Sequence, residues 1–294
     1  MQRATRIPIA GVHSPVYYVS DTSSTLDLAA SLLADTTTAT PHLTTIIADR
    51  QSAGRGRLGR TWTTPDGQAL LASTIVSLPT SFPTEMLGWL VYACALSVRD
   101  ALSPRLSPLG HTVSLKWPND VLVDGARKVC GILAQLAPAS SPFTTSAILG
   151  YGINIAQDAD HLATPQATSL YAEGDSEAGA DPTSVSHTLL AQILSGLDSR
   201  IRGLVTHGNA RDCGLADEAA NALPLLGTRI ALAKPTDPNG HPAMEGVALG
   251  LSPTGSLLVA TDDGHTHDIN AGDVLATGLP LTTVHDTKEK RANN

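Results

Sequence analysis

Aromatic residues are scarce in this 294-residue chain, and it has neither long apolar runs nor an excess of basic charge. Phe, Trp and Tyr make up 3% of it, which argues against a surface that stacks the bases of single-stranded nucleic acid. The formal net charge of −8 argues against a face that binds duplex nucleic acid. Because the chain has no run of about eighteen apolar residues and no signal-peptide core, we expect a cytoplasmic protein whose partners are neither nucleic acid nor membrane.

Cysteine is also rare, and its placement excludes two common kinds of site. The three residues, Cys94, Cys130 and Cys213, lie far apart and form no CxxC pair. An odd number at such spacing is typical of reduced thiols in a cytosolic protein, and not of a disulfide framework or a zinc site.

Lysine is the third scarce residue, with five among 19 basic residues. Only Lys116 and Lys128 occur before residue 234. A compositional bias toward arginine explains the scarcity, but it does not explain why these two lysines fall so close together. The segment between them is therefore a candidate for function.

Hydrophobic spacing predicts helices and strands in the first three quarters of the chain. Apolar residues at spacings of three and four predict helices over 25–34, 84–102 and 185–208. Short β-rich runs predict strands over 43–48, 68–78, 113–117, 120–125, 128–136 and 146–155. We expect residues 180–184, ADPTS, to form a surface loop.

The sequence pattern changes after about residue 224, where short β-rich runs at regular spacing predict a small all-β barrel. A chain of this length accommodates one large domain and a smaller one. We expect an N-terminal extension (1–15), an α+β main domain (16–222), a β domain (223–278) and a flexible tail (279–294).

Residues 51–62, QSAGRGRLGRTW, contain three glycines with the spacing GxGxxG. A dinucleotide-binding fold would continue from these glycines into a helix, with an acidic residue farther on for the ribose. Here the segment continues through a Pro-Asp-Gly turn into a strand, and no acidic residue lies at that distance. The sequence therefore excludes a Rossmann fold.

The same segment carries Arg55, Arg57 and Arg60. A solvated turn is one interpretation of such a cluster. Three guanidinium groups on a glycine-rich backbone also suit a ligand with several phosphoryl oxygens, to which arginine can bond bidentately. Glycines let such a loop approach a ligand closely and become ordered around it.

Further polar segments strengthen the second interpretation. Asn119 and Asp120 lie between the two early lysines, and such a pair can orient an amine or hold Mg²⁺. The glycines of LGYGINI (149–155) leave space beside the backbone. TSST (22–25) and Gln51 offer hydrogen-bond donors and acceptors that suit an uncharged polar group of a ligand.

In this order, SST (23–25), QSAGRGRLGRTW, KWPNDV (116–121), RKVCGIL (127–133) and LGYGINI resemble the catalytic module of biotin–protein ligases over most of residues 16–280. The resemblance implies a class II aminoacyl-tRNA-synthetase-like α+β domain followed by an SH3-like β barrel. It implies an enzyme that activates biotin with Mg²⁺ and ATP to biotinyl-5′-AMP. The biotinyl group then passes to a lysine of the biotin carboxyl carrier domain of an acyl-CoA or pyruvate carboxylase.

The resemblance also implies roles for particular residues. Those expected to contact biotin are Ser24, Thr25, Gln51, Gly54, Arg55, Lys128, Gly131, Gly150 and Gly152. Those expected to contact ATP or the adenylate are Arg57, Arg60, Trp62, Lys116, Asn119 and Asn154. Those expected to act in catalysis are Lys128, Arg57 and Asp120. Mg²⁺ is expected to arrive with the ATP phosphates, and Asn119 is the one candidate ligand from the protein.

Two features separate this sequence from the family pattern. Leu26 stands where the family usually has asparagine, which puts a polar role at that position in doubt. Only fifteen to twenty residues precede the matching segments, too few for the DNA-binding domain of bifunctional relatives, so we expect the monofunctional type. A lipoate-type ligase, a biotin-sensing repressor and a non-catalytic binding module remain as alternatives, and the oligomeric state stays open.

Overall fold

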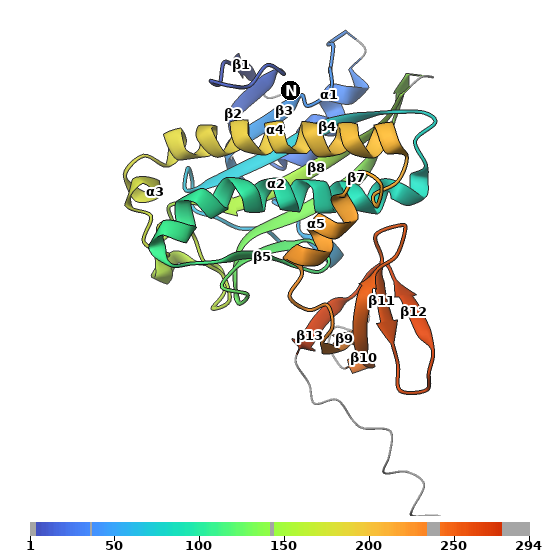
Figure 1. Cartoon of the computed structure of the whole chain (residues 1–294). Coiled ribbons are helices and arrows are strands. Elements are labelled where there is room, and N and C mark those ends of the chain that lie inside the picture. The colour runs from blue at the N-terminus through green and yellow to red at the C-terminus, as the bar shows by residue number, and fades with distance from the viewer. Residues whose placement is uncertain (1–3, 36, 142–143, 234–241, 278–294) are drawn as a thin grey trace, which may run out of the picture. The chain divides into compact units, whose positions relative to one another are not determined.

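A computed structural model describes residues 4–35, 37–141, 144–233 and 242–277 (Figure 1). The chain forms two compact units, Met1–Pro224 and Leu225–Asn294. The tail expected at 279–294 lies outside the described residues. Within the described part, no helix combines the length and the apolar character that crossing a membrane requires.

The first unit is built on an eight-stranded mixed sheet with the order β1-β2-β3-β4-β8-β7-β6-β5. Its strands are β1 (Thr5–Ile7), β2 (Val16–Thr22), β3 (Thr45–Gln51), β4 (Ala69–Pro79), β5 (Val113–Lys116), β6 (Asp120–Val123), β7 (Arg127–Ser141) and β8 (Thr144–Asn154). Among the strand pairs of the described residues in this sheet, only β2 and β3 are parallel, and α1 (Thr25–Ala34) forms the crossover between them. This mixed, largely antiparallel sheet agrees with the predicted α+β class.

Helix α1 covers one face of the sheet. Its residues Leu26, Ala29 and Leu33 pack in one cluster with Ile75 of β4 and Ile148 of β8. Because Ile75 and Ile148 are cross-strand partners, the residues that precede and follow them point to the opposite face. The face under α1 is called the α1 face below.

The opposite face is covered by α2 (Gly88–Leu106) and α4 (Pro182–His207), which run side by side (Figure 1). The segment 84–102 was predicted as one helix, but Thr84–Leu87 forms a short 3-10 turn before α2 begins. Two shorter helices, α3 (Ser176–Ala180) and α5 (Leu215–Ala222), were not predicted.

The prediction of a surface loop at residues 180–184 is wrong for most of that range. Asp181 is the N-cap of α4, and its carboxylate accepts a hydrogen bond from the N–H of Ser184 at 3.0 Å. Pro182 occupies the first turn, where a missing N–H costs nothing. The Asp-Pro pair therefore begins the helix, because it satisfies the exposed donors of the first turn.

The second unit is a five-stranded antiparallel sheet with the order β12-β11-β10-β9-β13. Its strands are β9 (Arg229–Ala233), β10 (Pro242–Leu251), β11 (Leu257–Ala260), β12 (Thr266–Ile269) and β13 (Asp273–Thr277). The predicted run of short strands is confirmed. The stretch from 266 to 276 forms two strands that pair at opposite edges of this sheet.

Candidate functional site

Three glycines on the α1 face mark a place where other groups approach the sheet backbone closely. Gly131 of β7 and Gly152 of β8 are cross-strand partners, and Gly150 lies two residues before Gly152. A Cβ atom at Gly152 would lie 2.6 Å from the indole of Trp62, and one at Gly131 would lie 2.9 Å from it. We call these three residues the glycine track. Any side chain larger than hydrogen would remove the space that the track provides.

Leu26 fills the space above one end of the track. A Cβ atom at Gly150 would lie 2.8 Å from the Leu26 side chain. Leu26 is 4% exposed and belongs to the cluster beneath α1. The residue that replaces the family's asparagine is therefore a core residue, and it has no polar role.

The start of α1 forms a polar cluster next to Gly150. The Gln51 side-chain oxygen accepts hydrogen bonds from the Thr25 N–H at 2.8 Å and from the Thr25 hydroxyl at 3.0 Å. Ser73 of β4, which pairs with Gly150, donates its hydroxyl to Thr25 Oγ1 at 2.8 Å. Ser73 was not predicted from the sequence, because a serine within an apolar strand has no distinguishing spacing.

Ser24 differs from its neighbours in this cluster. It is the N-cap of α1, yet its side chain makes no capping hydrogen bond. The residue is 1% exposed, and its hydroxyl has no hydrogen-bond partner among the described residues. Buried polar groups are nearly always paired, so this hydroxyl is a candidate contact for a ligand.

Residues 51–62 form a small hairpin that we call the arginine hook. Its two ends are held by a hydrogen bond from the Trp62 N–H to the Gly54 carbonyl at 2.9 Å, and by one from the Gly56 N–H to the Arg60 carbonyl at 2.7 Å. At the tip, Leu58 has a φ of 58°, in the left-handed region. The hook brings Trp62 onto the glycine track.

The arginines of the hook meet different partners. Arg55 forms an ion pair with Asp27 of α1, and both side chains are about half exposed. Arg57 donates to the side-chain oxygen of Asn119 at 3.2 Å. Arg60 is exposed at the tip. Asp27 was not identified from the sequence, because the fold alone brings the first turn of α1 near the hook.

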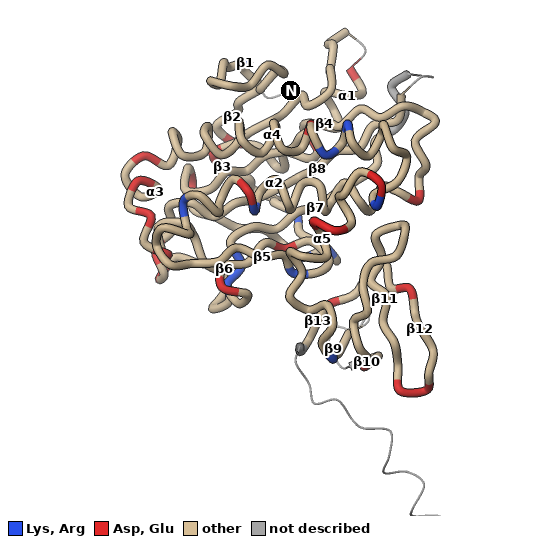
Figure 2. The backbone as a smooth tube through the Cα atoms, viewed as in Figure 1, with Lys and Arg blue, Asp and Glu red and all other residues tan. Residues whose placement is uncertain are grey.

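Lys128 lies beside the other end of the glycine track. Its Nζ atom is 2.7 Å from the carboxylate of Asp120 and 5.5 Å from the centroid of the Trp62 ring. Lys116 is the cross-strand partner of Asp120 in the β5–β6 hairpin, and it is exposed. Figure 2 shows acidic and basic positions next to one another at β6. Lys128 is therefore ion-paired with Asp120, and Lys116 lies opposite Asp120 across the hairpin.

Asn154, expected at the nucleotide, has one hydrogen bond at each end of its side-chain amide. It is 6% exposed, donates to the Thr168 carbonyl at 2.8 Å and accepts from the Gln157 amide at 3.1 Å. Its observed contacts anchor residues 157 and 168 to the end of β8.

The cysteines near the site are not nucleophiles. Cys94 and Cys130 are buried, and burial raises the pKa of Cys94 to about 12 and that of Cys130 well above its usual value. A thiol that stays protonated is unreactive. Both side chains belong to the core.

The described residues do not fit an Mg²⁺ ion held by the protein at this site. The oxygen of Asn119 accepts from the Arg57 guanidinium, and its amide donates to the Ile132 carbonyl at 2.6 Å. The nearby carboxylate of Asp120 is paired with Lys128. A hard cation needs several free oxygen ligands, whereas Asn119 Oδ1 and Asp120 Oδ1 each contact a cationic side chain.

One group of histidine and carboxylates in the described part of the chain has the spacing of a metal site. Ligand atoms of His111, Asp124 and Glu173 lie within 4.8 Å of one another. The Arg127 guanidinium pairs with both carboxylates, so their charge is already neutralised. The group is better described as an ion-pair network, and it is considered again below.

Taken together, these contacts describe a site for an anionic ligand with a neutral polar part. The neutral end is the cluster around Thr25, where the Ser24 hydroxyl lacks a partner. The charged end holds Lys128 and Arg57, with the Trp62 indole N–H also buried and without a hydrogen-bond partner in the described residues. Aspartates neutralise Lys128 and Arg55, so a bound anion would exchange with carboxylates already in place.

Known proteins share both units of this chain. Residues 19–154 match the biotin/lipoate A/B protein ligase family, and residues 236–275 match the biotin protein ligase C-terminal domain. The chain is 34% identical over 230 residues to the biotin–[acetyl-CoA-carboxylase] ligase of Mycobacterium tuberculosis, covering 78% of this chain and 77% of that protein. It is 31% identical over 218 residues to the enzyme of the same name from Paracoccus denitrificans, covering 73% and 82% respectively.

A solved structure supports the fold assignment. The biotin protein ligase of Aquifex aeolicus, in complex with biotin and ATP, superposes with a TM-score of 0.62 at 24% identity. The match covers 89% of this chain and 97% of that one. The large mixed sheet and the smaller antiparallel sheet therefore recur together in that protein.

Proposed function

The chain belongs to the biotin protein ligase family, and on that premise we propose that it activates biotin with ATP and transfers the biotinyl group to a lysine of a biotin carboxyl carrier domain. The acceptor would belong to an acyl-CoA or pyruvate carboxylase. The observation that carries the proposal is the position of Lys128, beside the glycine track, beneath Trp62 and paired with Asp120.

In the first step, a carboxylate oxygen of biotin attacks the α-phosphorus of ATP, and pyrophosphate leaves. The obstacle is electrostatic, because two anions must come within bonding distance. Lys128 would exchange Asp120 for the oxygens of the biotin carboxylate and the α-phosphate, and Arg57 would face the phosphates from the hook. Fixed cations of this kind stabilise the charge that develops in the transition state.

Biotin would lie along the glycine track with its ureido group at the start of α1. Ser24, Thr25 and Gln51 supply donors and acceptors there, and the track leaves room for an aliphatic chain. Arg55 and Gly54 would close over this part from the hook. Trp62 would then move aside or stack beside the ligand, and Lys116, Asn119, Arg60 and Asn154 would surround the nucleotide.

In the second step, the amine of the carrier lysine attacks the carbonyl carbon of biotinyl-5′-AMP, and AMP leaves. A lysine with a pKa of about 10.4 is protonated at neutral pH and is then not a nucleophile. Asp120 is the carboxylate closest to Lys128, so its release from the ion pair would free it to accept the proton from the incoming ammonium group.

Finer points of the architecture belong to the same proposal. We infer that the first unit has the class II aminoacyl-tRNA-synthetase-like fold and that the second is an SH3-like barrel. Mg²⁺ would be carried by the nucleotide phosphates, since Asn119 Oδ1 and Asp120 Oδ1 each already contact a cationic side chain.

ATP–pyrophosphate exchange with purified protein tests the proposal, with biotin and with lipoate as the acid. The family match includes lipoate ligases, so the comparison separates the two substrates. Exchange that depends on biotin is the expected result. Exchange with lipoate alone would support the alternative ligase, and exchange with neither acid would contradict the proposed activity.

Ser24→Ala separates binding from stability. Because the hydroxyl forms no capping bond in the free protein, the free energy of unfolding should not fall by the amount of about 1 kcal/mol typical of a lost N-cap. The KM for biotin should rise roughly two- to tenfold, as for one lost hydrogen bond. Urea unfolding and steady-state exchange measure both quantities, and a destabilised variant with unchanged KM would contradict this role.

Limited trypsin digestion tests closure of the arginine hook. Arg55, Arg57 and Arg60 provide cleavage sites within the hairpin, and Arg55 and Arg60 are exposed. Cleavage should be fast in the free protein and slow with biotin and ATP together, because the ligand orders the hook. ATP with lipoate serves as the control. Equal cleavage rates with and without biotin and ATP would contradict the closure.

A further inference from the structure

Lys128 lies at an irregularity of β7, and its backbone is not held by the sheet alone. The pairing of β6 with β7 shifts so that Leu122 faces Lys128 and Val121 faces Cys130, which leaves Val129 as an extra residue. Such a bulge redirects the side chains around it. The direction of the Lys128 side chain therefore depends on whatever holds this part of the strand.

A segment outside the sheet provides that support. The Lys128 N–H donates to the Gln166 carbonyl at 2.7 Å, and the Thr168 N–H donates to the Lys128 carbonyl at 2.8 Å. Residues 128 and 167 form an isolated parallel bridge, so the segment around residue 167 is not part of an extended strand. Thr168 is thus one bond away from the backbone of the proposed catalytic lysine.

Glu173 fixes Thr168 in turn. The Thr168 hydroxyl donates to Glu173 Oε1 at 2.6 Å, while the Thr168 carbonyl accepts from Asn154 at 2.8 Å. The Glu173 side chain is 7% exposed. A buried carboxylate must be fully paired, so its partners are held in fixed positions.

The second partner of Glu173 is Arg127, the residue immediately before Lys128. Arg127 donates from Nε to Glu173 Oε1 at 2.5 Å and from a terminal nitrogen to Oε2 at 2.8 Å. The same guanidinium reaches Asp124 at 2.7 Å. Glu173 therefore binds two residues next to Lys128. One is Arg127, which precedes Lys128 in β7, and the other is Thr168, which is hydrogen-bonded to the Lys128 backbone.

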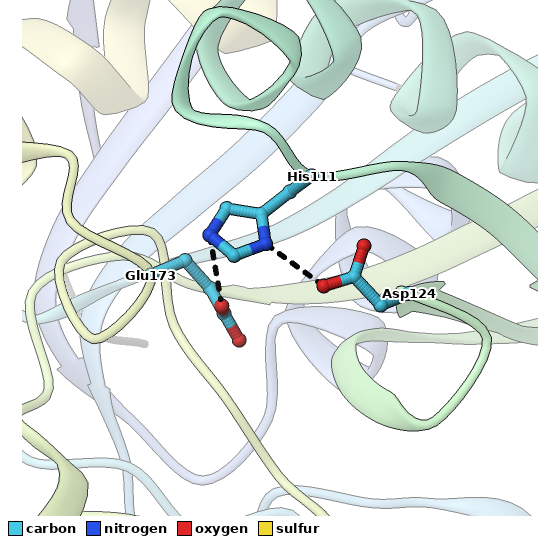
Figure 3. A group of neighbouring side chains, drawn as sticks. All are labelled: His111, Asp124 and Glu173. Carbon is cyan, nitrogen blue, oxygen red and sulfur yellow. Dashed lines mark hydrogen bonds and ion pairs between the residues drawn. The ribbon is translucent and has the colours of Figure 1, made fainter.

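His111 completes this network. Figure 3 shows its ring between the two carboxylates, with one nitrogen toward Asp124 at 2.8 Å and the other toward Glu173 at 3.4 Å. Burial raises the pKa of Glu173, but the hydrogen bonds from Arg127 and Thr168 outweigh it and leave the pKa below its usual value. The carboxylate is therefore ionised at neutral pH, and its bidentate pair with Arg127 is charge-assisted.

We propose that Glu173 is a positioning residue for the adenylation step: it holds Arg127 and Thr168, and through them sets the direction of the Lys128 side chain over the glycine track. This inference rests on the role proposed for Lys128. Glu173 itself touches no substrate in this account. It acts because the described contacts of the Lys128 backbone on the side away from β6 are with Gln166 and Thr168, and Glu173 holds the Thr168 side chain there.

Glu173→Gln tests the proposal by steady-state exchange. Glutamine keeps an oxygen for the Thr168 hydroxyl but loses the charge that binds Arg127. We expect kcat to fall roughly tenfold, since displacement of a reacting group by part of an ångström has effects of this order. The KM values for biotin and ATP should stay within about twofold, because the variant leaves ground-state contacts in place.

Asp175→Asn is the matched control. Asp175 is 8% exposed, lies two residues from Glu173 and forms a similar bidentate pair with Arg105 of α2. It has no contact with Thr168 or Arg127 among those observed. Its loss should lower the thermal midpoint while kcat at a temperature well below that midpoint stays within about twofold of wild type. Equal losses of kcat in both variants would identify a structural effect and overturn the proposal.

A double-mutant cycle with Lys128→Arg gives the decisive comparison. If Glu173 acts through Lys128, Glu173→Gln should lower kcat about tenfold in the wild-type background and less than about twofold in the Lys128→Arg background. The same factor in both backgrounds, or an unchanged kcat in Glu173→Gln, would overturn the inference alone. Wild-type protein without biotin-dependent exchange would overturn the proposed function, and the inference with it.

Discussion

Replacing Lys128 with alanine should lower biotin-dependent ATP–pyrophosphate exchange by about 10²–10³-fold while the protein stays folded. The loss follows from the charges in the first step, where the ammonium group would lie between the biotin carboxylate and the α-phosphate. Without it the two anions repel each other, and the Asp120 carboxylate adds a third negative charge nearby. Exchange at saturating biotin and ATP measures the effect directly.

Stability should change little in this variant. The Lys128 side chain is 34% exposed and that of Asp120 is 19% exposed, and a partly exposed ion pair contributes about 1 kcal/mol or less. Thermal unfolding checks this expectation. Arg211→Ala removes an exposed cation outside the site and should leave exchange unchanged. Exchange within a fewfold of wild type in Lys128→Ala would remove the proposed mechanism.

Gly54→Ala should disable the arginine hook without unfolding the protein. A Cβ atom at Gly54 would lie 2.4 Å from the carbonyl oxygen of Trp62, which is a backbone atom and cannot rotate away. The hairpin must open, and Arg55, Arg57 and Trp62 move with it. Exchange should fall by about 10²-fold, as expected when several contacting groups are displaced by about 1 Å.

Gly56→Ala is the matched control within the same hairpin. Gly56 has a φ of −106°, which alanine adopts readily, and an added Cβ would meet nothing closer than the Arg60 carbonyl at 3.4 Å. We expect a much smaller loss of exchange than for Gly54→Ala. Because residues 54–62 belong to none of the strands of the sheet, neither variant should shift the thermal midpoint by more than a few degrees. Equal exchange rates for the two variants would show that the hairpin geometry is irrelevant to catalysis.

Local patterns predicted the main helices well. The helix predicted at 25–34 coincides with α1, and that predicted at 185–208 differs from α4 by three residues at its start and one at its end. Both have apolar residues at spacings of three and four. Gly208 ends α4 in the left-handed region, as expected for a glycine that follows a helix. α3 has five residues and α5 has eight, which is too short for such periodicity to be detected.

The candidate site was predictable only where its residues belong to contiguous motifs. Lys128, Asp120 and Trp62 lie in recognisable segments, and the structure brings them together. Ser73 and Asp27 join the site through strand pairing and helix placement, which no local pattern encodes. The same holds for the support of Lys128, because its backbone bonds reach a segment almost forty residues away in the sequence.

A crystal structure with biotinyl-5′-AMP tests the central claim most directly. The account predicts that the biotinyl group lies along Gly131, Gly150 and Gly152. Lys128 Nζ should be within hydrogen-bonding distance of the oxygens that join the acyl and phosphoryl groups, and the arginine hook should be closed over both. An adenylate bound elsewhere on the protein, or bound there with Lys128 still on Asp120 and the hook open, would contradict it.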